Sequence, residues 1–253
     1  MSDYIVRIRR HWESLSQLDP DTSIIDPNDR RGEKNRYIAW LRDRAFKAAL
    51  TRVDADGAGR FEVVLDYGCG SGSASLPLLR DGRVVVGIDI AQGLLAQAAR
   101  RCATYPCIFA RSDGVSLPLR RSSVDAVVTY GVLIYLLDDA DAEQLLREIR
   151  ASMRPGALIV IIEQAKRRHG LSNDGIKVFR TPAEWKALLE AAGFVVDRTA
   201  IMRSGRFPLV PLIRTGIVPR ALWPLIAMLE GWFVRAVGIP PWDYVDLVLE
   251  AHS

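Results

Sequence analysis

A glycine-rich turn follows an apolar run in the first third of the chain. Residues 63–72 read VVLDYGCGSG, and a helical pattern comes next. Glycines let the backbone approach a ligand closely and take positive φ, and the first turn of a helix offers unpaired N–H groups. The pattern is typical of a site for a nucleotide-type cofactor. Taken alone, it also suits a tight strand-to-helix turn that binds nothing.

Two features of this turn distinguish between cofactors. Asp66 stands shortly before Gly68, where a carboxylate repels a pyrophosphate and attracts a cationic amino group. A dinucleotide-binding turn has Gly or Ala at the position that Ser73 occupies here. Both features disfavour a nicotinamide dinucleotide, and with it a dehydrogenase, and favour another adenosyl ligand.

Two further aspartates extend the predicted site. Asp89 ends an apolar run about 20 residues after the turn, where a carboxylate accepts hydrogen bonds from ribose hydroxyls in either class of cofactor. Asp113 follows the next such run and is placed to accept from the exocyclic amine of adenine. Each alone is equally well explained as a solvated loop carboxylate. Together, at the ends of consecutive strands, they indicate an adenosyl site.

The elements that position these residues alternate between short β-branched runs and longer helical patterns, which is typical of a parallel sheet covered on both faces. Each unit reads strand, turn, helix, which predicts an α/β fold with a doubly wound, Rossmann-like sheet. Thr181 and Pro182, followed by Glu184, predict a capping box at a helix start. We expect strands at 62–66, 84–89, 107–110, 124–130, 157–163, 194–200 and 242–251, and helices at 73–80, 92–102, 140–153 and 182–192.

Two segments lie outside this alternation, a helical N-terminal cap at 1–50 and an apolar lid or insertion at 203–241. The rest of the chain is predicted to form a cofactor-binding core at 51–202 and a final core strand at 242–253. The longest uncharged run of the insertion, at 221–229, is far shorter than the ~20 residues that a membrane-spanning helix needs. We therefore expect the insertion to pack on the core or to meet a partner.

Composition and charge exclude several classes of protein. With 49% hydrophobic and 25% charged residues, the 253-residue chain is neither disordered nor a coiled coil. The net charge is +4 and the basic residues are spread along the chain, which argues against nucleic-acid binding. The three cysteines lack the spacing of a zinc site or a disulfide framework, so we expect no metal and a reducing, cytoplasmic location. No apolar segment follows the basic N-terminus, so we expect no signal peptide.

From about Phe61 to Gly193 the sequence resembles the class I S-adenosylmethionine-dependent methyltransferases. The motifs that carry the resemblance are LDYGCGSG at 65–72, GIDI at 87–90, SDG at 112–114 with LPL at 117–119, SVDAV at 123–127, and the stretch 146–158, which ends in PGAL. The resemblance implies a seven-stranded sheet whose last strand is antiparallel. It also implies S-adenosyl-L-methionine as the cofactor.

The resemblance assigns roles to individual residues. Asp66, Gly68 and Gly70 would hold the methionine portion of the cofactor and Asp89 its ribose. Ile90 would pack on adenine, Asp113 and Gly114 would bind the adenine edge, and Tyr130 would lie beneath the sulfonium. Arg36 or Tyr37 in the N-terminal cap would reach the methionine carboxylate, although a surface arginine and a core tyrosine explain these two positions as well.

Methyl transfer from a sulfonium is an in-line displacement with an activated leaving group, so the protein has to orient the acceptor, exclude water and remove a proton from a hydroxyl. The candidates for the base are Glu163, our first choice, then Tyr135, His169 and His11. Glu163 could instead cap a helix or loop, and His11 could be a partly exposed helix residue. His169 follows a basic run and could belong to a solvated or anion-contacting loop.

The predicted function is methyl transfer to a small-molecule or lipid-linked acceptor, with a hydroxyl favoured. One alternative is a membrane-surface methyltransferase of a quinone or glycolipid head group, and another is a non-catalytic module that binds the adenosyl ligand. The insertion at 203–241 would act as a lid or homodimer contact, as a peripheral membrane contact through Arg214, Arg220 and Arg235, or as simple core packing.

Overall fold

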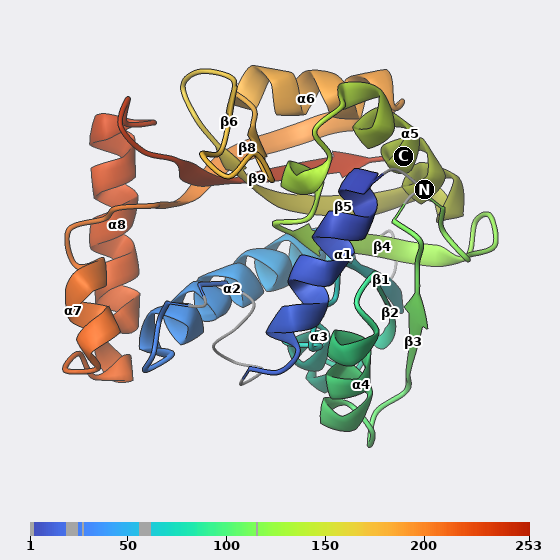
Figure 1. The fold of residues 1–253 in the computed structure, drawn as a ribbon, viewed down its shortest axis with the longest axis horizontal. Helices are drawn as coiled ribbons and strands as arrows, with labels where there is room; N and C mark the ends of the chain where they lie inside the picture. The colour runs from blue at the N-terminus through green and yellow to red at the C-terminus, as the bar shows by residue number, and fades with distance from the viewer. Residues whose placement is uncertain (1–2, 19–24, 27, 56–61, 115) are drawn as a thin grey trace.

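The computed structural model describes residues 3–18, 25, 26, 28–55, 62–114 and 116–253 (Figure 1). Phe61, where the resemblance begins, and part of the polar stretch between the two N-terminal helical patterns lie outside the described residues. All the predicted site residues lie within them.

A seven-stranded sheet of order β3-β2-β1-β4-β5-β9-β8 forms the centre of the molecule. Its strands are β1 (Val63–Tyr67), β2 (Val84–Asp89), β3 (Cys107–Arg111), β4 (Val124–Tyr130), β5 (Met153–Ala165), β8 (Val195–Ser204) and β9 (Val245–His252). Strands β1 to β5 are parallel, and β9 lies antiparallel between β5 and β8. The predicted Rossmann-like sheet with an antiparallel last strand is confirmed.

Strand β5 begins earlier than the sequence predicts. Helix α5 (Asp139–Ser152) ends before Pro155, and Met153 already pairs with Val124 of β4. The register then shifts, so that Leu158 pairs with Ala126, and Gly156 takes a φ of +74° within this irregular stretch. Pro155 lacks an N–H and Gly156 takes positive φ, and both properties suit such a bulge. Strand β5 therefore runs through these two residues.

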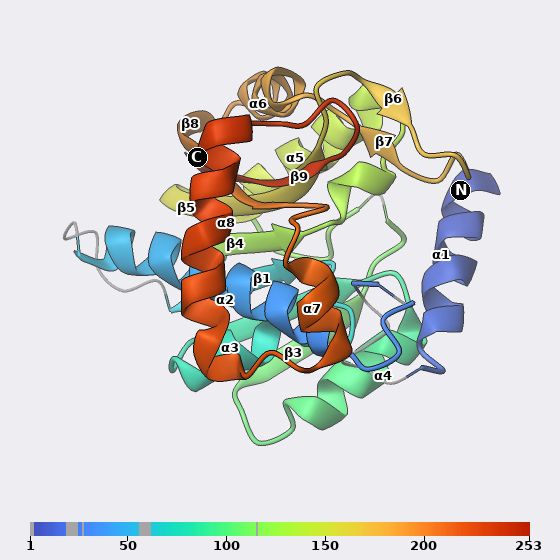
Figure 2. The same cartoon turned by 90° about the vertical axis from the view of Figure 1, so that its left-hand side faces the viewer.

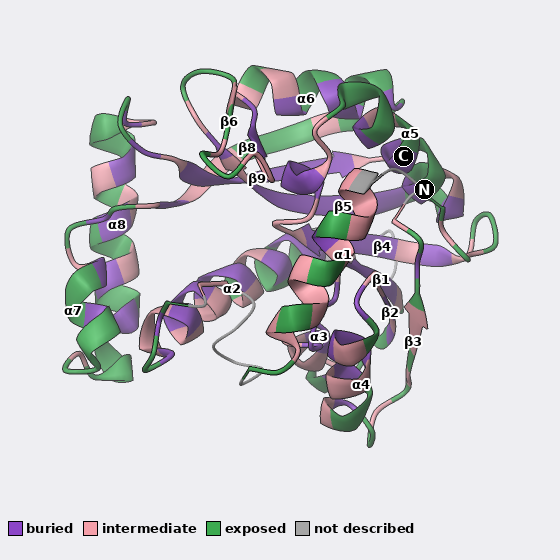
Figure 3. Cartoon of the chain, in the orientation of Figure 1, coloured by how far each residue is buried: buried purple, intermediate pink, exposed green. Residues whose placement is uncertain are grey.

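Helices cover both faces of the sheet (Figures 1 and 3). On one face, α5 and α6 (Pro182–Ala191) pack on Leu65, Val127 and Ile159. On the other, α2 (Glu33–Ala55) and α3 (Ser75–Arg80) pack on alternate strand residues such as Val64 and Val160. Helix α4 (Gln92–Arg101) covers β2 and β3. The predicted capping box of α6 is present.

The N-terminal 50 residues do not form one separate cap. Phe46, Ala49 and Leu50 of α2 belong to the sheet's own apolar core, and the helix runs past the predicted boundary to Ala55. Of the two helices described in this segment, α1 (Asp3–Leu15) stands apart from the sheet, as Figure 2 shows. The second helical pattern is therefore a core helix.

The insertion and a short hairpin complete the fold. The insertion forms α7 (Val210–Thr215), the 3-10 helix η2 (Arg220–Leu222) and α8 (Trp223–Val237), and packs against Tyr37 and Leu41 of α2. The hairpin of β6 (Gly170–Leu171) and β7 (Val178–Phe179) was not predicted. In the described residues, no helix has the length and apolar character needed to cross a membrane.

Glu163 of β5 caps the 3-10 helix η1 (Leu133–Tyr135) that follows β4. Its Oε1 accepts hydrogen bonds from the backbone N–H groups of Val132, at 2.8 Å, and Leu133, at 2.7 Å, while Oε2 accepts from Ile134 at 3.3 Å. The side chain is buried, and this desolvation raises the pKa of the Glu163 carboxyl from its ordinary 4.5 to about 7, against the opposing effect of the three N–H donors.

We predict that replacing Glu163 by Gln changes how stability depends on pH. Because the folded state binds the proton of Glu163 more tightly than the unfolded chain, the stability linked to this group is present below pH 4.5 and is lost as the pH rises through about 7. Relative to Glu163→Gln, the wild type should lose up to roughly 3 kcal/mol of unfolding free energy over that interval. Urea denaturation at several pH values measures this loss.

Glu148→Gln, at an exposed position of α5, is the control and should leave the pH profile of the wild type unchanged. Parallel profiles for the wild type and Glu163→Gln would contradict the prediction.

Candidate active site

A cavity of about 400 Å³ opens at the carboxyl ends of β1, β2, β4 and β5. The strand order reverses between β1 and β4, and this switch point is where open α/β sheets bind ligands. We call its two parts the glycine half, lined by Gly68, Gly70, Asp89, Ile90 and Gly114, and the aromatic half, lined by Tyr4, Trp12, Tyr135, Phe179 and Tyr244.

The glycine turn forms the floor of the glycine half. Gly68 has a φ of +74°, and a Cβ at this position would collide with the side chain of Val132 after β4. The Oδ2 atom of Asp89 accepts a hydrogen bond from Gly70 N at 2.9 Å, and its Oδ1 accepts from Ala91 N at 2.9 Å. The carboxylate at the end of β2 thus holds the turn at the end of β1.

Asp66 lies beneath this turn and does not line the cavity. It is buried, and its Oδ2 accepts a hydrogen bond from Ser75 Oγ at 2.6 Å. Burial raises the pKa of the Asp66 carboxyl to about 6, whereas the hydrogen bond from Ser75 lowers it. The predicted contact between Asp66 and a cationic amino group stays a prediction.

Ile90 and Gly114 line the far end of the glycine half together with Ser112, and their contacts with adenine stay a prediction. Asp113 does not line it, because its carboxylate accepts hydrogen bonds from the backbone N and the hydroxyl of Ser116, at 2.8 and 2.9 Å. Tyr130, at the end of β4, also lines the cavity.

Arg36 and Tyr37 do not reach the cavity. Arg36 forms an ion pair with Glu33 at 2.8 Å, and the hydroxyl of Tyr37 donates a hydrogen bond to Glu230 of α8 at 3.0 Å. Lys34 and Ile38 of the same helix line the cavity instead. Residues four apart share a helix face, and the sequence did not show which face of α2 turns inward.

Helix α1 closes the cavity from above. The Tyr4 hydroxyl lies 2.6 Å from the carbonyl oxygen of Tyr135 and 2.8 Å from that of Ile176, and donates to one of them. The Trp12 ring meets the Tyr135 ring edge-on at 5.3 Å. Helix α1 is therefore the lid. The structure describes every residue of the predicted lid at 203–241, and of these only Arg203 lines the cavity.

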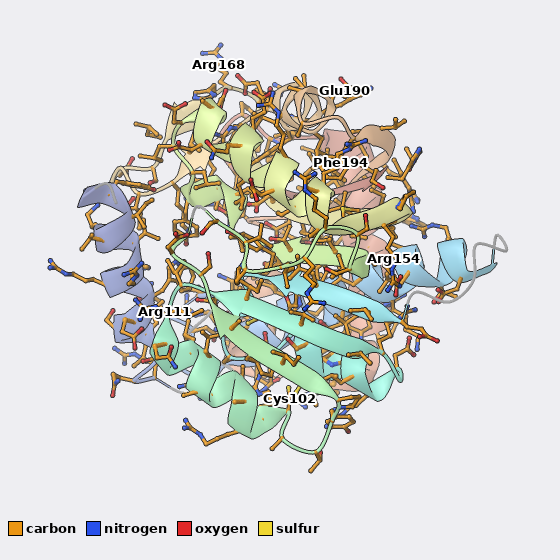
Figure 4. All side chains as sticks on the ribbon, turned by 90° about the vertical axis from the view of Figure 1, so that its right-hand side faces the viewer. Cys102, Arg111, Arg154, Arg168, Glu190 and Phe194 are labelled. Carbon is orange, nitrogen blue, oxygen red and sulfur yellow. The ribbon has the colours of Figure 1, made fainter. Side chains whose placement is uncertain are left out.

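The four candidate bases are spread over different environments. Glu163 and Tyr135 line the cavity, and His11 and His169 do not. Burial raises the pKa of the Tyr135 hydroxyl well above its usual range, so it stays protonated at neutral pH. His169 is exposed and lies 3.2 Å from Glu184, and the neighbouring Arg168 points away from the body of the protein (Figure 4). The hydrogen bonds of Glu163 favour capping over proton transfer.

Three basic side chains at the aromatic half were missed by the sequence reasoning. Arg203 and Asp246 are register partners on β8 and β9 and form a buried ion pair at 2.8 Å. Lys34 pairs with Asp26 at 2.7 Å, and Lys177 precedes β7. Strand alternation could have placed Arg203 and Asp246 on one face of the sheet, but only the register makes them neighbours.

Comparisons with known proteins agree with this geometry. A methyltransferase domain model matches residues 64–156. A probable S-adenosylmethionine-dependent methyltransferase of Mycolicibacterium smegmatis is 29% identical over 236 residues, 89% of this chain and 84% of that protein. A demethylmenaquinone methyltransferase of Clavibacter sepedonicus is 33% identical over 131 residues, and the match spans 51% of each chain.

A solved structure of magnesium protoporphyrin IX methyltransferase from Synechocystis, with bound S-adenosylmethionine, has a TM-score of 0.61 at 17% identity and covers 100% of this chain and 98% of that one. The glycine turn, the aspartate of β2 and the seven-stranded sheet fit the same cofactor. These matches and the geometry of the site support a class I S-adenosylmethionine-dependent methyltransferase, an enzyme that uses this cofactor.

Proposed function

We propose that this enzyme methylates a hydroxyl of a small, largely apolar acceptor that binds beneath α1. The observation that carries the proposal is the aromatic half of the cavity, where Tyr4, Trp12, Tyr135, Phe179 and Tyr244 surround a space continuous with the glycine half. An acceptor bound there lies next to the cofactor site and is covered by a helix. A quinone in the name of the Clavibacter sepedonicus relative supports an apolar ring as acceptor.

For the cofactor we propose the following contacts. Gly68 and Gly70 would support the methionine portion, with Asp66 beneath them, and Tyr130 would lie under the sulfonium. Asp89 would accept from the ribose hydroxyls, Ile90 would pack on adenine, and Gly114 would bind its edge. The Asp113 carboxylate, which accepts hydrogen bonds from Ser116, is not among these contacts. S-adenosylmethionine, when bound, supplies the activated methyl group.

The protein's contribution to the reaction is orientation and the exclusion of water. Holding two reactants in line supplies ~7–11 kcal/mol of the barrier. The hydrogen bond of Tyr4 and the ring contact of Trp12 fix α1 over the cavity, which keeps water from the sulfonium. We route no proton through Glu163, because its oxygens already accept three backbone hydrogen bonds.

The cofactor site is tested by calorimetric titration with S-adenosylhomocysteine. We predict binding by the wild type and an affinity about tenfold or more lower for Asp89→Asn, because a neutral amide replaces a carboxylate that accepts charge-assisted hydrogen bonds. Asp197→Asn, on the exposed part of β8, is the control and should bind as the wild type does. The cofactor contacts proposed for Asp89 are wrong if both variants bind equally well.

A second proposal is that the enzyme is cytoplasmic and docks on a membrane through an exposed apolar surface. Exposed apolar side chains cover α8 and its flanks; they are Leu212, Ile217, Leu222, Leu225, Met228, Leu229, Trp232 and Trp242. Four exposed arginines lie among them, namely Arg206, Arg214, Arg220 and Arg235. We call this set the α7–α8 face. Glu230, the only acidic residue between 203 and 242, is buried.

The α7–α8 face combines what an amphipathic membrane contact needs, apolar side chains for the acyl boundary and arginines for anionic head groups. It is also connected to the cavity. Arg220 pairs with Glu33 at 3.2 Å, and Arg214 donates to the carbonyl oxygen of Asn28, so the face is joined to the segment that carries Asp26 and Lys34. An apolar acceptor held in a membrane would lie near this segment.

If the α7–α8 face docks on a membrane, the wild type should co-sediment with phosphatidylcholine vesicles that contain phosphatidylglycerol. A double variant with Leu225→Glu and Trp232→Glu should lose most of this binding. The control is Ile108→Glu, which places the same charge on an exposed apolar residue of the edge strand β3. Equal co-sedimentation of all three proteins would overturn membrane docking. A wild-type dimer that the double variant converts to a monomer in sedimentation velocity would assign the face to a second copy.

A further inference from the structure

Lys177 is a cation on the wall of the aromatic half. It precedes β7 and lines the cavity together with Ser172 and Asp174 of the same hairpin. Its ammonium nitrogen lies 5.4 Å from the centroid of the Tyr135 ring. The hairpin is pinned beside the cavity, because Ser172 Oγ accepts a hydrogen bond from Lys177 N at 3.0 Å and the Tyr4 hydroxyl contacts Ile176.

Lys177 differs from the other cations that line the cavity. Lys34 is neutralised by Asp26 and Arg203 by Asp246, both below 3 Å. Within the part of the chain that the structure describes, no carboxylate lies within 4.0 Å of the Lys177 nitrogen. The aromatic half thus keeps one positive charge that no fixed carboxylate pairs, and an anionic ligand group would match it.

The walls around Lys177 suit a flat ring. Trp12 and Tyr135 meet edge-on, and Phe179 stacks on Tyr244 with ring centroids 6.4 Å apart and an interplanar angle of 25°. Aromatic side chains arranged in this way favour planar ligands through offset and edge-to-face contacts. Lys166 lies over the Phe179 ring, with its nitrogen 3.8 Å from the ring centroid, but it does not line the cavity.

We propose that Lys177 binds the acidic oxygen of a phenolic or enolic acceptor and that its neutral amine takes the proton of that oxygen. This inference rests on the proposed function. The O–H bond breaks and the proton moves to the lysine nitrogen, which leaves an oxyanion beside the ammonium. The oxyanion forms the new O–C bond to the methyl carbon while the C–S bond breaks and its electron pair stays on sulfur. The ammonium then releases its proton to water.

Several charged or titratable groups face Lys177. They are Asp174 on the hairpin, Glu163 on β5, Asp246 on β9, Asp26 before α2, Tyr135 on η1 and His11 on α1. Burial lowers the pKa of the Lys177 ammonium, and the four carboxylates oppose this effect. A lysine whose amine form is more accessible than usual is suited to accept a proton from an acidic hydroxyl.

The test uses 4-nitrophenol, a flat phenol whose ionised form has its own absorption band. The full-length protein is saturated with S-adenosylhomocysteine, and the affinity and apparent pKa of the bound phenol are measured by absorption. We expect the wild type to lower the apparent pKa of the phenol. Lys177→Met should abolish this shift and weaken binding about tenfold or more, whereas Lys177→Arg should keep tight binding of the phenolate.

Lys166→Met is the matched control, because it removes a lysine that lies over Phe179, another ring of the aromatic half, without lining the cavity, and it should behave as the wild type. The role of Lys177 is overturned if Lys177→Met binds 4-nitrophenol with unchanged affinity and pKa, or if the wild type does not bind it while S-adenosylhomocysteine binds. Absence of S-adenosylhomocysteine binding in the wild type would overturn the proposed function itself, and with it the inference.

Discussion

The hydrogen bond between Asp89 and Gly70 joins the ends of β1 and β2, and the cavity depends on it. Because Gly68 also packs against Val132 with no room for a Cβ, the turns after β1 and β4 are fixed relative to each other. Two neighbouring strands of the sheet thereby form a floor on which a ligand rests. The same geometry explains why the sequence places glycines at these positions, since only they allow both the positive φ and the close approach.

Three sequentially distant segments complete the site above this floor. Helix α1 covers it through Tyr4 and Trp12, the β6–β7 hairpin brings Lys177 to its wall, and β8 and β9 supply the ion pair of Arg203 and Asp246. Each segment lies on a different part of the fold, so the aromatic half forms only when the whole chain is folded.

The fold and the glycine half were largely predictable from sequence because they depend on local patterns. The glycine turn, the aspartate that ends β2 and the capping box at Thr181 each involve residues close together in the chain. The aromatic half was not predictable in this way. Its rings lie on α1, η1, β7 and the segment before β9, and contacts between residues far apart in the chain bring them together. On α2, a one-residue error in helix phase is enough to name Tyr37 in place of Ile38.

We propose that one continuous cavity holds the cofactor on the glycine turn and the acceptor beneath α1. A crystal structure with S-adenosylhomocysteine would test this arrangement. We expect the adenosine between Ile90 and Gly114, the amino-acid end over Gly68, and the sulfur facing Tyr135 and Lys177. A ligand whose sulfur faces away from the aromatic rings, or a crevice occupied by a nicotinamide dinucleotide, would contradict it.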